Sequence, residues 1–133
     1  MLDSDTAIEI MRHPRGATAD RFIALSQRDV AISMITKAEI FVGPYRKKSH
    51  ADEMAKVRDF LTRVRIIPFD DACADEFGKI AAGLFDAGRP IDGMDMEIAA
   101  TARHWNMILV TGNTGHFQAI PNLMIEDWMG AGK

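Results

Sequence analysis

The sequence has almost no cysteine and no long apolar run. Its single cysteine, Cys73, cannot form a disulfide within the chain, so a hydrophobic core must hold the 133 residues together. No apolar run approaches the length of a membrane span, and no charged segment followed by an apolar one marks a signal peptide. With 47% hydrophobic and 26% charged residues, the composition predicts one globular domain over residues 1–133, located in the cytoplasm and not bound to a membrane.

Positive charge is also scarce, since 16 lysine and arginine residues face 19 aspartate and glutamate residues and the net charge is −3. This balance argues against a protein that holds nucleic acid by bulk positive charge. It does not exclude an enzyme that cuts nucleic acid, because such an enzyme gathers carboxylates to bind metal. The positive charge is patchy, with one group at Arg12, His13 and Arg15 and another at Arg46, Lys47 and Lys48. Each group is as consistent with a solvated surface as with a binding site.

Two kinds of catalytic motif are missing. The sequence has no Gly-x-Gly-x-x-Gly and no glycine-rich loop that ends in Gly-Lys-Ser/Thr, which disfavours the nucleotide-binding enzymes that use them. Cys73 has no matching histidine and acidic partner in any recognisable pattern, which argues against cysteine catalysis.

Short apolar runs alternate with stretches of helical period along the chain. The apolar runs are 30–32, 66–69, 107–110 and 123–125, with Met1 and Leu2 as the end of a further one. Between them, apolar residues at helical spacing predict helices around residues 54–64 and 77–84, the second capped by Asp71 and ended by Gly88 and Pro90. Strands that alternate with helices need crossover connections, so we expect an α/β fold with a parallel sheet covered on both faces.

Acidic residues follow several predicted strands, and the carboxyl edge of a parallel sheet usually carries the site. Asp3 and Asp5 come directly after the first apolar residues. In an extended chain their carboxylates would point to one side and repel each other unless a cation lay near them. Helix capping is a simpler explanation for Asp5, because Ser4, Asp5 or Thr6 can cap the next helix. Thr6 with Glu9 also fits a capping box. Capping does not explain Asp3, which we expect to be functional.

Glu39 and Asp95 lie on helices that follow strands. On a helix, Ile35, Ala38 and Val42 share the face of Glu39, and Asp95 sits in the same way beside apolar residues of its own helix. A carboxylate on an apolar stripe is costly unless it is paired, protonated or bound to metal. A buried ion pair would also explain Glu39, and the helix dipole would favour Asp95 in a first turn. Together with Asp3, these acids predict one acidic cluster.

The segment 111–117 follows an apolar run and is rich in turn residues with hydroxyl and amide side chains. Such groups orient carboxylates and water without adding charge, so Thr111 and Asn113 are candidates for supporting the acids or contacting substrate. His116 can bind metal or transfer a proton, although a lone histidine in a turn is more often ordinary surface.

Taken together, these segments resemble a PIN domain of the VapC type, the ribonuclease toxin of bacterial toxin–antitoxin pairs. Residues 2–5 look like the family's opening Leu-Asp-Thr-Asn, and residues 38–43 resemble its Ala-Glu-Leu followed by a glycine. Residues 88–102 are very like its third block, residues 109–117 resemble the fourth, and residues 125–128 resemble the closing strand. The blocks come in the family's order and span nearly the whole chain.

The resemblance implies a PIN-like three-layer α/β/α sandwich with a five-stranded parallel sheet, a Mg²⁺ or Mn²⁺ site, and cleavage of RNA. It also implies a homodimer, or a heteromer with a cognate VapB-type antitoxin, with contact to DNA only through the antitoxin. By position, Asp3, Glu39 and Asp95 correspond to the family's acidic triad, which binds the metal. Asp5 takes the place of the usual asparagine, and Thr111 that of a polar support residue.

The chain departs from the family in two respects. His116 stands where the family often has an aspartate, so a fourth acid is missing or is replaced by Asn113. The first strand is short, because only Met1 and Leu2 precede Asp3.

Two alternatives remain open at this point. One is a non-catalytic PIN-like binding module that has lost its activity with the fourth acid. The other is a haloacid-dehalogenase-like phosphatase that uses Asp3, since residues 3–6 match its Asp-x-Asp-x-Thr opening and Asp70 with Asp71 follows a strand. The phosphatase would leave the other two acids of the triad unexplained.

Overall fold

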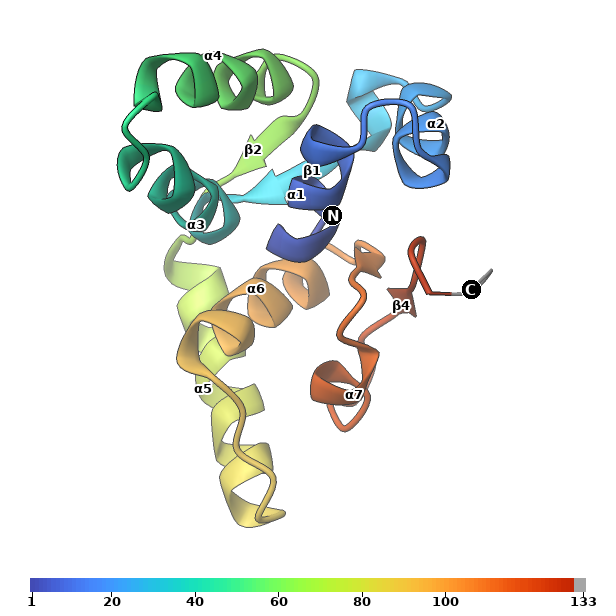
Figure 1. Cartoon of the computed structure of the whole chain (residues 1–133). Helices are drawn as coiled ribbons and strands as arrows, with labels where there is room; N and C mark the ends of the chain where they lie inside the picture. Colours follow the sequence, from blue (N-terminus) through green and yellow to red (C-terminus); the bar gives the residue numbers. More distant parts are fainter. Residues whose placement is uncertain (131–133) are drawn as a thin grey trace.

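A computed structural model describes residues 1–130 as helices alternating with short strands (Figure 1). Residues 131–133, which the predicted domain includes, lie outside the described residues. The strands are β1 (Ala31–Ser33), β2 (Arg65–Ile67), β3 (Leu109–Val110) and β4 (Ile125–Glu126). The helices are α1 (Ser4–Arg12), α2 (Ala17–Ile23), the 3₁₀ turn η1 (Gln27–Asp29), α3 (Met34–Tyr45), α4 (His50–Leu61), α5 (Asp71–Asp86), α6 (Gly93–His104) and α7 (Thr114–Phe117). Within residues 1–130, no helix is long and apolar enough to cross a membrane.

The strands form two parallel pairs, β1 with β2 and β3 with β4. Leu2 lies between the pairs and makes one parallel bridge to Ile32 of β1 and one to Val110 of β3. The predicted five-stranded sheet is therefore not confirmed in the described residues. The first strand is reduced to one bridging residue, because only Met1 and Leu2 precede the N-cap of α1.

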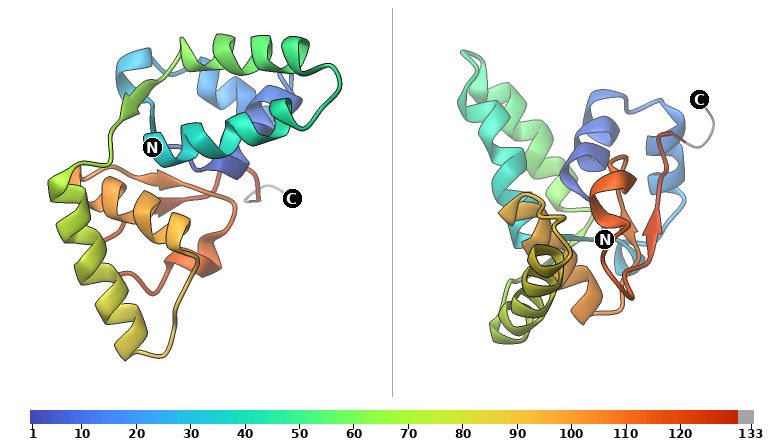
Figure 2. Two further views of the ribbon diagram at one scale, coloured as in Figure 1. Left: turned by 90° about the vertical axis from the view of Figure 1, so that its left-hand side faces the viewer. Right: turned by 90° about the horizontal axis from the view of Figure 1, so that it is seen from below.

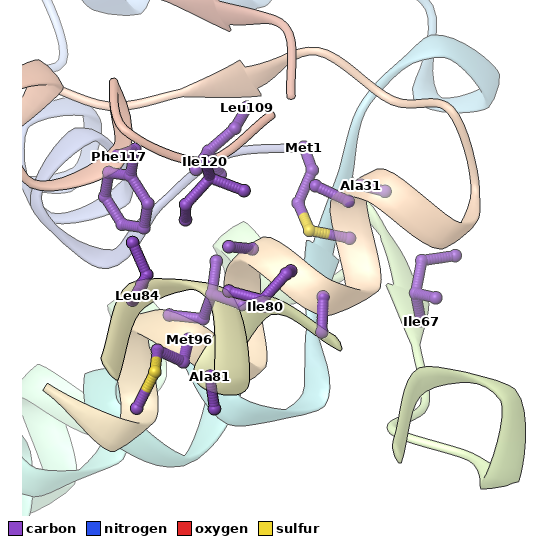
Figure 3. Packing of buried hydrophobic residues seen from close by; sticks show 14 residues of the cluster. Met1, Ala31, Ile67, Ile80, Ala81, Leu84, Met96, Leu109, Phe117 and Ile120 are labelled. Atoms are coloured by element: carbon purple, nitrogen blue, oxygen red, sulfur yellow. The ribbon is translucent and has the colours of Figure 1, made fainter. Parts of the chain in front are cut away.

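Successive residues of these segments point to opposite sides, so each segment contributes to two hydrophobic cores. On one side, α5, α6 and α7 pack over the strands, and on the other side α1 to α4 do so (Figures 1 and 2). Figure 3 shows the first core at close range. Met1 and the strand residues Ala31, Ile67 and Leu109 enter the first core, and Leu2 with the strand residues Ile32 and Val110 enters the second. The expected α/β fold, with parallel strands covered on both faces, is confirmed.

Helix α6 lies at the centre of the first core. Ile98 and the alanines at 99, 100 and 102 are fully buried, which lets α6 pack between the strands and α5. At the end of α6, Arg103 Nε donates to Glu76 Oε2 of α5 at 2.6 Å, and Arg103 Nη1 donates to the Pro121 carbonyl at 3.1 Å. Arg103 therefore joins α6 to α5 and to the segment before β4. This attachment fixes the C-terminal end of α6, whereas Asp95 lies in the first turn at the other end.

The predicted boundaries of α5 differ from the observed ones by one residue at the start. Asp70, not Asp71, is the N-cap, because Asp70 Oδ1 accepts a hydrogen bond from the Cys73 backbone N–H at 3.0 Å. The helix ends before Gly88, as expected. Gly88 has a φ of 67°, in the left-handed region that favours glycine after a helix.

Replacing Leu2 tests how much the fold depends on this bridging residue. Leu2 is 1% exposed, so Leu2→Ala removes buried apolar contacts between the two strand pairs and is expected to lower the free energy of unfolding by about 2–5 kcal/mol. Leu25, which is 40% exposed, serves as the control, and Leu25→Ala should cost far less. Urea denaturation of the two variants measures both effects. Equal losses in the two variants would contradict the central role of Leu2.

Candidate acidic active site

Asp3 connects the start of α1 to the end of β3. It is the N-cap of α1, and its Oδ1 accepts a hydrogen bond from the Ser4 backbone N–H at 2.7 Å. Its Oδ2 accepts a hydrogen bond from Thr111 Oγ1, directly after β3, at 2.9 Å. Asp3 is only 6% exposed. Its burial, together with the charges of Asp5 and Asp95, raises the pKa of its carboxyl to about 6 despite these hydrogen bonds. Nearby positive charge would therefore stabilise the ionised form of Asp3.

Capping does explain Asp3, contrary to the expectation from the sequence. Helix α1 begins at Ser4, so Ser4, Asp5 and Thr6 lie in its first turn and none of them is the cap. The predicted repulsion between Asp3 and Asp5 is confirmed, because the charge of Asp5 raises the pKa of Asp3. Asp5 is not part of an extended segment with Asp3, however, contrary to the prediction from the sequence. The cause is the short first strand, which gives way to helix immediately after Asp3.

Asp5 instead joins α1 to the loop that follows β3. Its Oδ1 accepts from the Thr6 backbone N–H at 2.7 Å, and its Oδ2 accepts from the Gly112 backbone N–H at 3.1 Å. A Cβ at position 112 would lie 3.0 Å from Asp5 Oδ2 and 2.5 Å from Met129 Cε, so a larger residue would have to displace both side chains, and glycine suits this position. Burial raises the pKa of Asp5, and the charge of Asp127 raises it further.

Asp127 is a residue at this edge that the sequence analysis did not select. It directly follows β4, and with Asp5 and Asn113 it lines a shallow cleft of about 330 Å³. Its Oδ1 accepts from the backbone N–H groups of Met129 and Gly130 at 2.8 and 2.9 Å. The signal that identifies Asp3, an acid directly after a strand, also applies to Asp127.

Glu39 approaches the same acids from α3. Ser4 Oγ donates a hydrogen bond to Glu39 Oε1 and so connects α1 to α3. Burial raises the pKa of Glu39, and the charges of Asp95, Asp92 and Asp5 add to this effect. Glu39 is therefore close enough to the other acids to be affected by their charges.

The apolar stripe predicted beside Glu39 is wrong. Val42 is 54% exposed and Ala38 is also exposed, whereas the buried face of α3 consists of Thr36, Ile40 and Pro44. Apolar spacing does not reveal this face because it includes the polar residue Thr36. Thr36 can be buried because its hydroxyl accepts a hydrogen bond from Ser33 Oγ at 3.2 Å. The apolar stripe predicted beside Asp95 is confirmed, because Ile98, Ala99 and Ala102 of α6 are fully buried.

Asp95 lies in the first turn of α6 and contacts the loop after β3. Its side chain is 18% exposed, and its Oδ2 lies 3.0 Å from His116 Nδ1. The Asn113 amide nitrogen lies 2.9 Å from the same ring nitrogen. An ionised Asp95 only accepts hydrogen bonds, so its contact with the ring requires a proton on Nδ1 and leaves Nε2 for another partner. The Asn113 amide must then turn its oxygen, not its nitrogen, toward Nδ1, because two donors cannot bond to each other. The structure thus brings Asn113 and His116 to Asp95, and Thr111 to Asp3.

No lysine or arginine within residues 1–130 neutralises Asp3, Asp5, Glu39 or Asp95. There, Asp3, Asp5 and Glu39 form no ion pair, and Asp95 is paired only with His116. In the same part of the chain, no three His, Cys, Asp or Glu side chains are close enough to form a metal centre as they stand. Asp3, Glu39 and Asp95 are therefore neighbours whose charges repel, not a preformed set of ligands.

The acidic pair that suggested a phosphatase has a structural role. Asp70 is exposed and caps α5 through the Cys73 N–H. Asp71 is exposed in the first turn of the same helix. The charges that act on Asp3 come from Asp5 and Asp95. The phosphatase alternative therefore loses its support.

Comparison with known proteins agrees with this arrangement. The model of the PIN domain matches residues 1–123. The chain is 32% identical over 128 residues to "tRNA(fMet)-specific endonuclease VapC" of Shigella flexneri, and the match covers 96% of both proteins. It is 33% identical over 129 residues to "Ribonuclease VapC2" of Rickettsia felis, again over 96% of both.

A solved structure gives the same result in three dimensions. The fold is similar to a chain in the crystal structure of VapBC2 from Rickettsia felis bound to a DNA fragment from their promoter. The TM-score is 0.90 at 30% identity, covering 97% of this chain and 98% of the other. The chain belongs to the PIN domain family, among the relatives named VapC.

Proposed function

We propose that this protein is a metal-dependent endoribonuclease and the toxin of a VapBC-type toxin–antitoxin pair. The observation that carries the proposal is the approach of Asp3, Glu39 and Asp95, from three separate segments, without a lysine or arginine among the described residues to neutralise them. The names of the relatives, endonuclease and ribonuclease, support the same activity. One of these names specifies tRNA(fMet), so tRNA is the first substrate to test.

Asp3, Glu39 and Asp95 would hold the metal ion, Mg²⁺ or Mn²⁺. Their side chains offer only oxygen donors, which suit hard divalent cations. Burial and neighbouring acids raise the pKa of Asp3 and of Glu39, so a bound cation would stabilise their ionised forms. When bound, the ion supplies a Lewis acid for the scissile phosphate and for water.

The surrounding residues orient these three acids. The Ser4 backbone N–H and the Thr111 hydroxyl hold the two oxygens of Asp3, while the Ser4 hydroxyl holds Glu39. His116 holds Asp95 through Nδ1, and its ring is half exposed, so Nε2 is available to a substrate oxygen. Fixed orientations of this kind reduce the reorganisation that the reaction requires.

A cognate VapB-type antitoxin is the proposed partner, in a heteromer or alongside a homodimer in the cytoplasm. The support is the similarity to a chain of the Rickettsia felis VapBC2 complex with promoter DNA. With a net charge of −3, this chain is expected to contact DNA only through the antitoxin.

Asp95→Asn tests the nuclease activity. The parent should cleave bulk tRNA with Mg²⁺ or Mn²⁺ and not in EDTA, and Asp95→Asn should lower the rate by about 100-fold or more, because a metal ligand loses its charge. Glu97→Gln, on the same helix, is the matched control and should stay within about twofold of the parent. Gel analysis of the cleavage products measures both. A parent that leaves RNA intact under all these conditions would favour the non-catalytic binding module.

His116→Gln tests the support of Asp95. Removing a partner that orients a metal ligand typically weakens metal binding by about 10–100-fold, so calorimetric titration with Mn²⁺ should show weaker binding. His116→Asp should tighten Mn²⁺ binding, because it adds a carboxylate beside Asp95. His104→Gln, which changes an exposed histidine at the other end of α6, is the control. Unchanged Mn²⁺ affinity in both His116 variants would assign the residue to the surface.

Asp3→Asn tests the electrostatic cost of the site without metal. The pKa of Asp3 is about 6 in the folded chain, above its ordinary value of 3.8, so stability falls as the pH rises through this window. Asparagine caps helices as well as aspartate and carries no charge. In EDTA at pH 7, the free energy of unfolding of Asp3→Asn should therefore exceed that of the parent by up to about 3 kcal/mol. This difference should disappear near pH 4, where Asp3 is protonated in the folded parent.

Asp70→Asn is the control for this measurement, because Asp70 is also an N-cap but its pKa is lowered by the Cys73 N–H. Its replacement should reduce stability at pH 7 and lose its effect at acid pH. Urea denaturation across this pH range measures both variants. If Asp3→Asn destabilises the chain at pH 7 as Asp70→Asn does, Asp3 is only a helix cap.

A further inference from the structure

One member of each group of basic residues seen in the sequence lines the same groove of the folded chain. Helices α1, α3 and α4 pack against one another, as Figure 2 shows. Between them lies a groove of about 290 Å³. Arg12 from the last turn of α1 and Lys47 from the segment after α3 both line it, and Lys56 of α4 adds a third cation. Residues far apart in the chain thus contribute to one positively charged groove.

The same groove contains one of the acids of the proposed site. Glu39, which Ser4 holds by a hydrogen bond, is among its lining residues. The groove therefore runs from the acidic site toward the basic residues. Its remaining wall is formed by a second acid, Glu53, and by apolar residues with one glycine: Ile8, Met11, Ile40, Gly43, Pro44 and Val57.

Most of the positive charge in this groove is not used within the chain. Arg12 and Lys47 are exposed and form no ion pair among residues 1–130. Lys56 Nζ lies 3.6 Å from Glu53 Oε1, but its side chain is 66% exposed, and exposed pairs of this kind contribute little. These cations are therefore available to an external anion.

We infer that this groove binds the phosphate backbone of the RNA strand next to the cleavage site, through Arg12, Lys47 and Lys56. The inference rests on the proposed nuclease function. A chain with net charge −3 and unneutralised acids at its site repels RNA, so local cations must hold the strand. Flexible lysine and arginine side chains suit phosphates because such contacts position a strand without reading its bases.

The double variant Arg12→Gln/Lys47→Gln tests this assignment. It should raise the KM for bulk tRNA by roughly tenfold and leave kcat within about twofold, because neither residue belongs to the acidic site. The slope of log KM against log salt concentration should become shallower by about 2, one for each lost phosphate contact. Lys56→Gln should shift KM in the same direction by a smaller factor.

Arg28→Gln/Arg65→Gln is the matched control. Both residues line a different cavity, near the starts of the strands, so this variant loses the same charge outside the groove. Its KM and salt slope should stay at the parent values. Thermal melting checks that each variant is folded, and the single variants Arg12→Gln and Lys47→Gln replace the double one if it does not fold.

Direct binding separates this inference from the proposed function. In the Asp95→Asn background, the anisotropy of fluorescein-labelled tRNA reports binding without cleavage, and the groove variants should bind about tenfold more weakly than the control. If the parent fails to cleave RNA, the nuclease function is wrong, and the anisotropy still decides the role of the groove. Unchanged RNA binding in the groove variants overturns the inference. Unchanged RNA binding together with lost binding of the co-expressed antitoxin would overturn the inference and assign the groove to an acidic segment of that partner.

Discussion

The buried carboxylate of Asp3 is the group on which the arrangement of this site depends. One of its oxygens accepts a hydrogen bond from the Ser4 N–H at the start of α1, and the other accepts one from the Thr111 hydroxyl after β3. The acid therefore cannot turn toward solvent without loss of both contacts. Burial and the neighbouring acids raise its pKa, which means that the fold holds this carboxylate where its charge is less stable than in water. Structural contacts that hold a group in an unfavourable electrostatic environment are typical of functional sites.

Two of the other acids also come after strands, since Asp127 directly follows β4 and Glu39 lies on the helix after β1. Asp95 does not, because α6 follows α5 and not a strand, contrary to the expectation from the sequence. Their partners are a hydroxyl for Glu39 and a half-exposed imidazole for Asp95. The positive charge lies farther along the groove of Arg12 and Lys47. Acids and cations are thus separated within one surface, which suits a polyanionic substrate that needs both.

The sequence predicts the fold class and the proximity of these acids better than it predicts their local contacts. The alternation of apolar runs and helical periods requires parallel strands, and the buried run of α6 around Ile98 places Asp95 at its edge. The role of Asp3 as a cap could not be predicted, since a strand of two residues gives no pattern from which to locate the start of a helix. The apolar stripe predicted for α3 is wrong because the polar residue Thr36 lies on the buried face of the helix, while Val42 of the predicted stripe is exposed. The convergence of Arg12 and Lys47 depends on helix packing, which has no signature in the sequence.

The bridge that Leu2 makes to Val110 also has a consequence for biosynthesis. Asp3 N–H donates to the Val110 carbonyl at 2.8 Å, so the beginning of the chain is completed by residues more than a hundred positions later. Contacts of such long sequence separation form only after both segments have been made. A ribosome therefore releases most of the polypeptide before Asp3 has its Thr111 partner. A prematurely terminated fragment that ends before β3 contains Asp3, Glu39 and Asp95 but not the contacts that hold Asp3 in place.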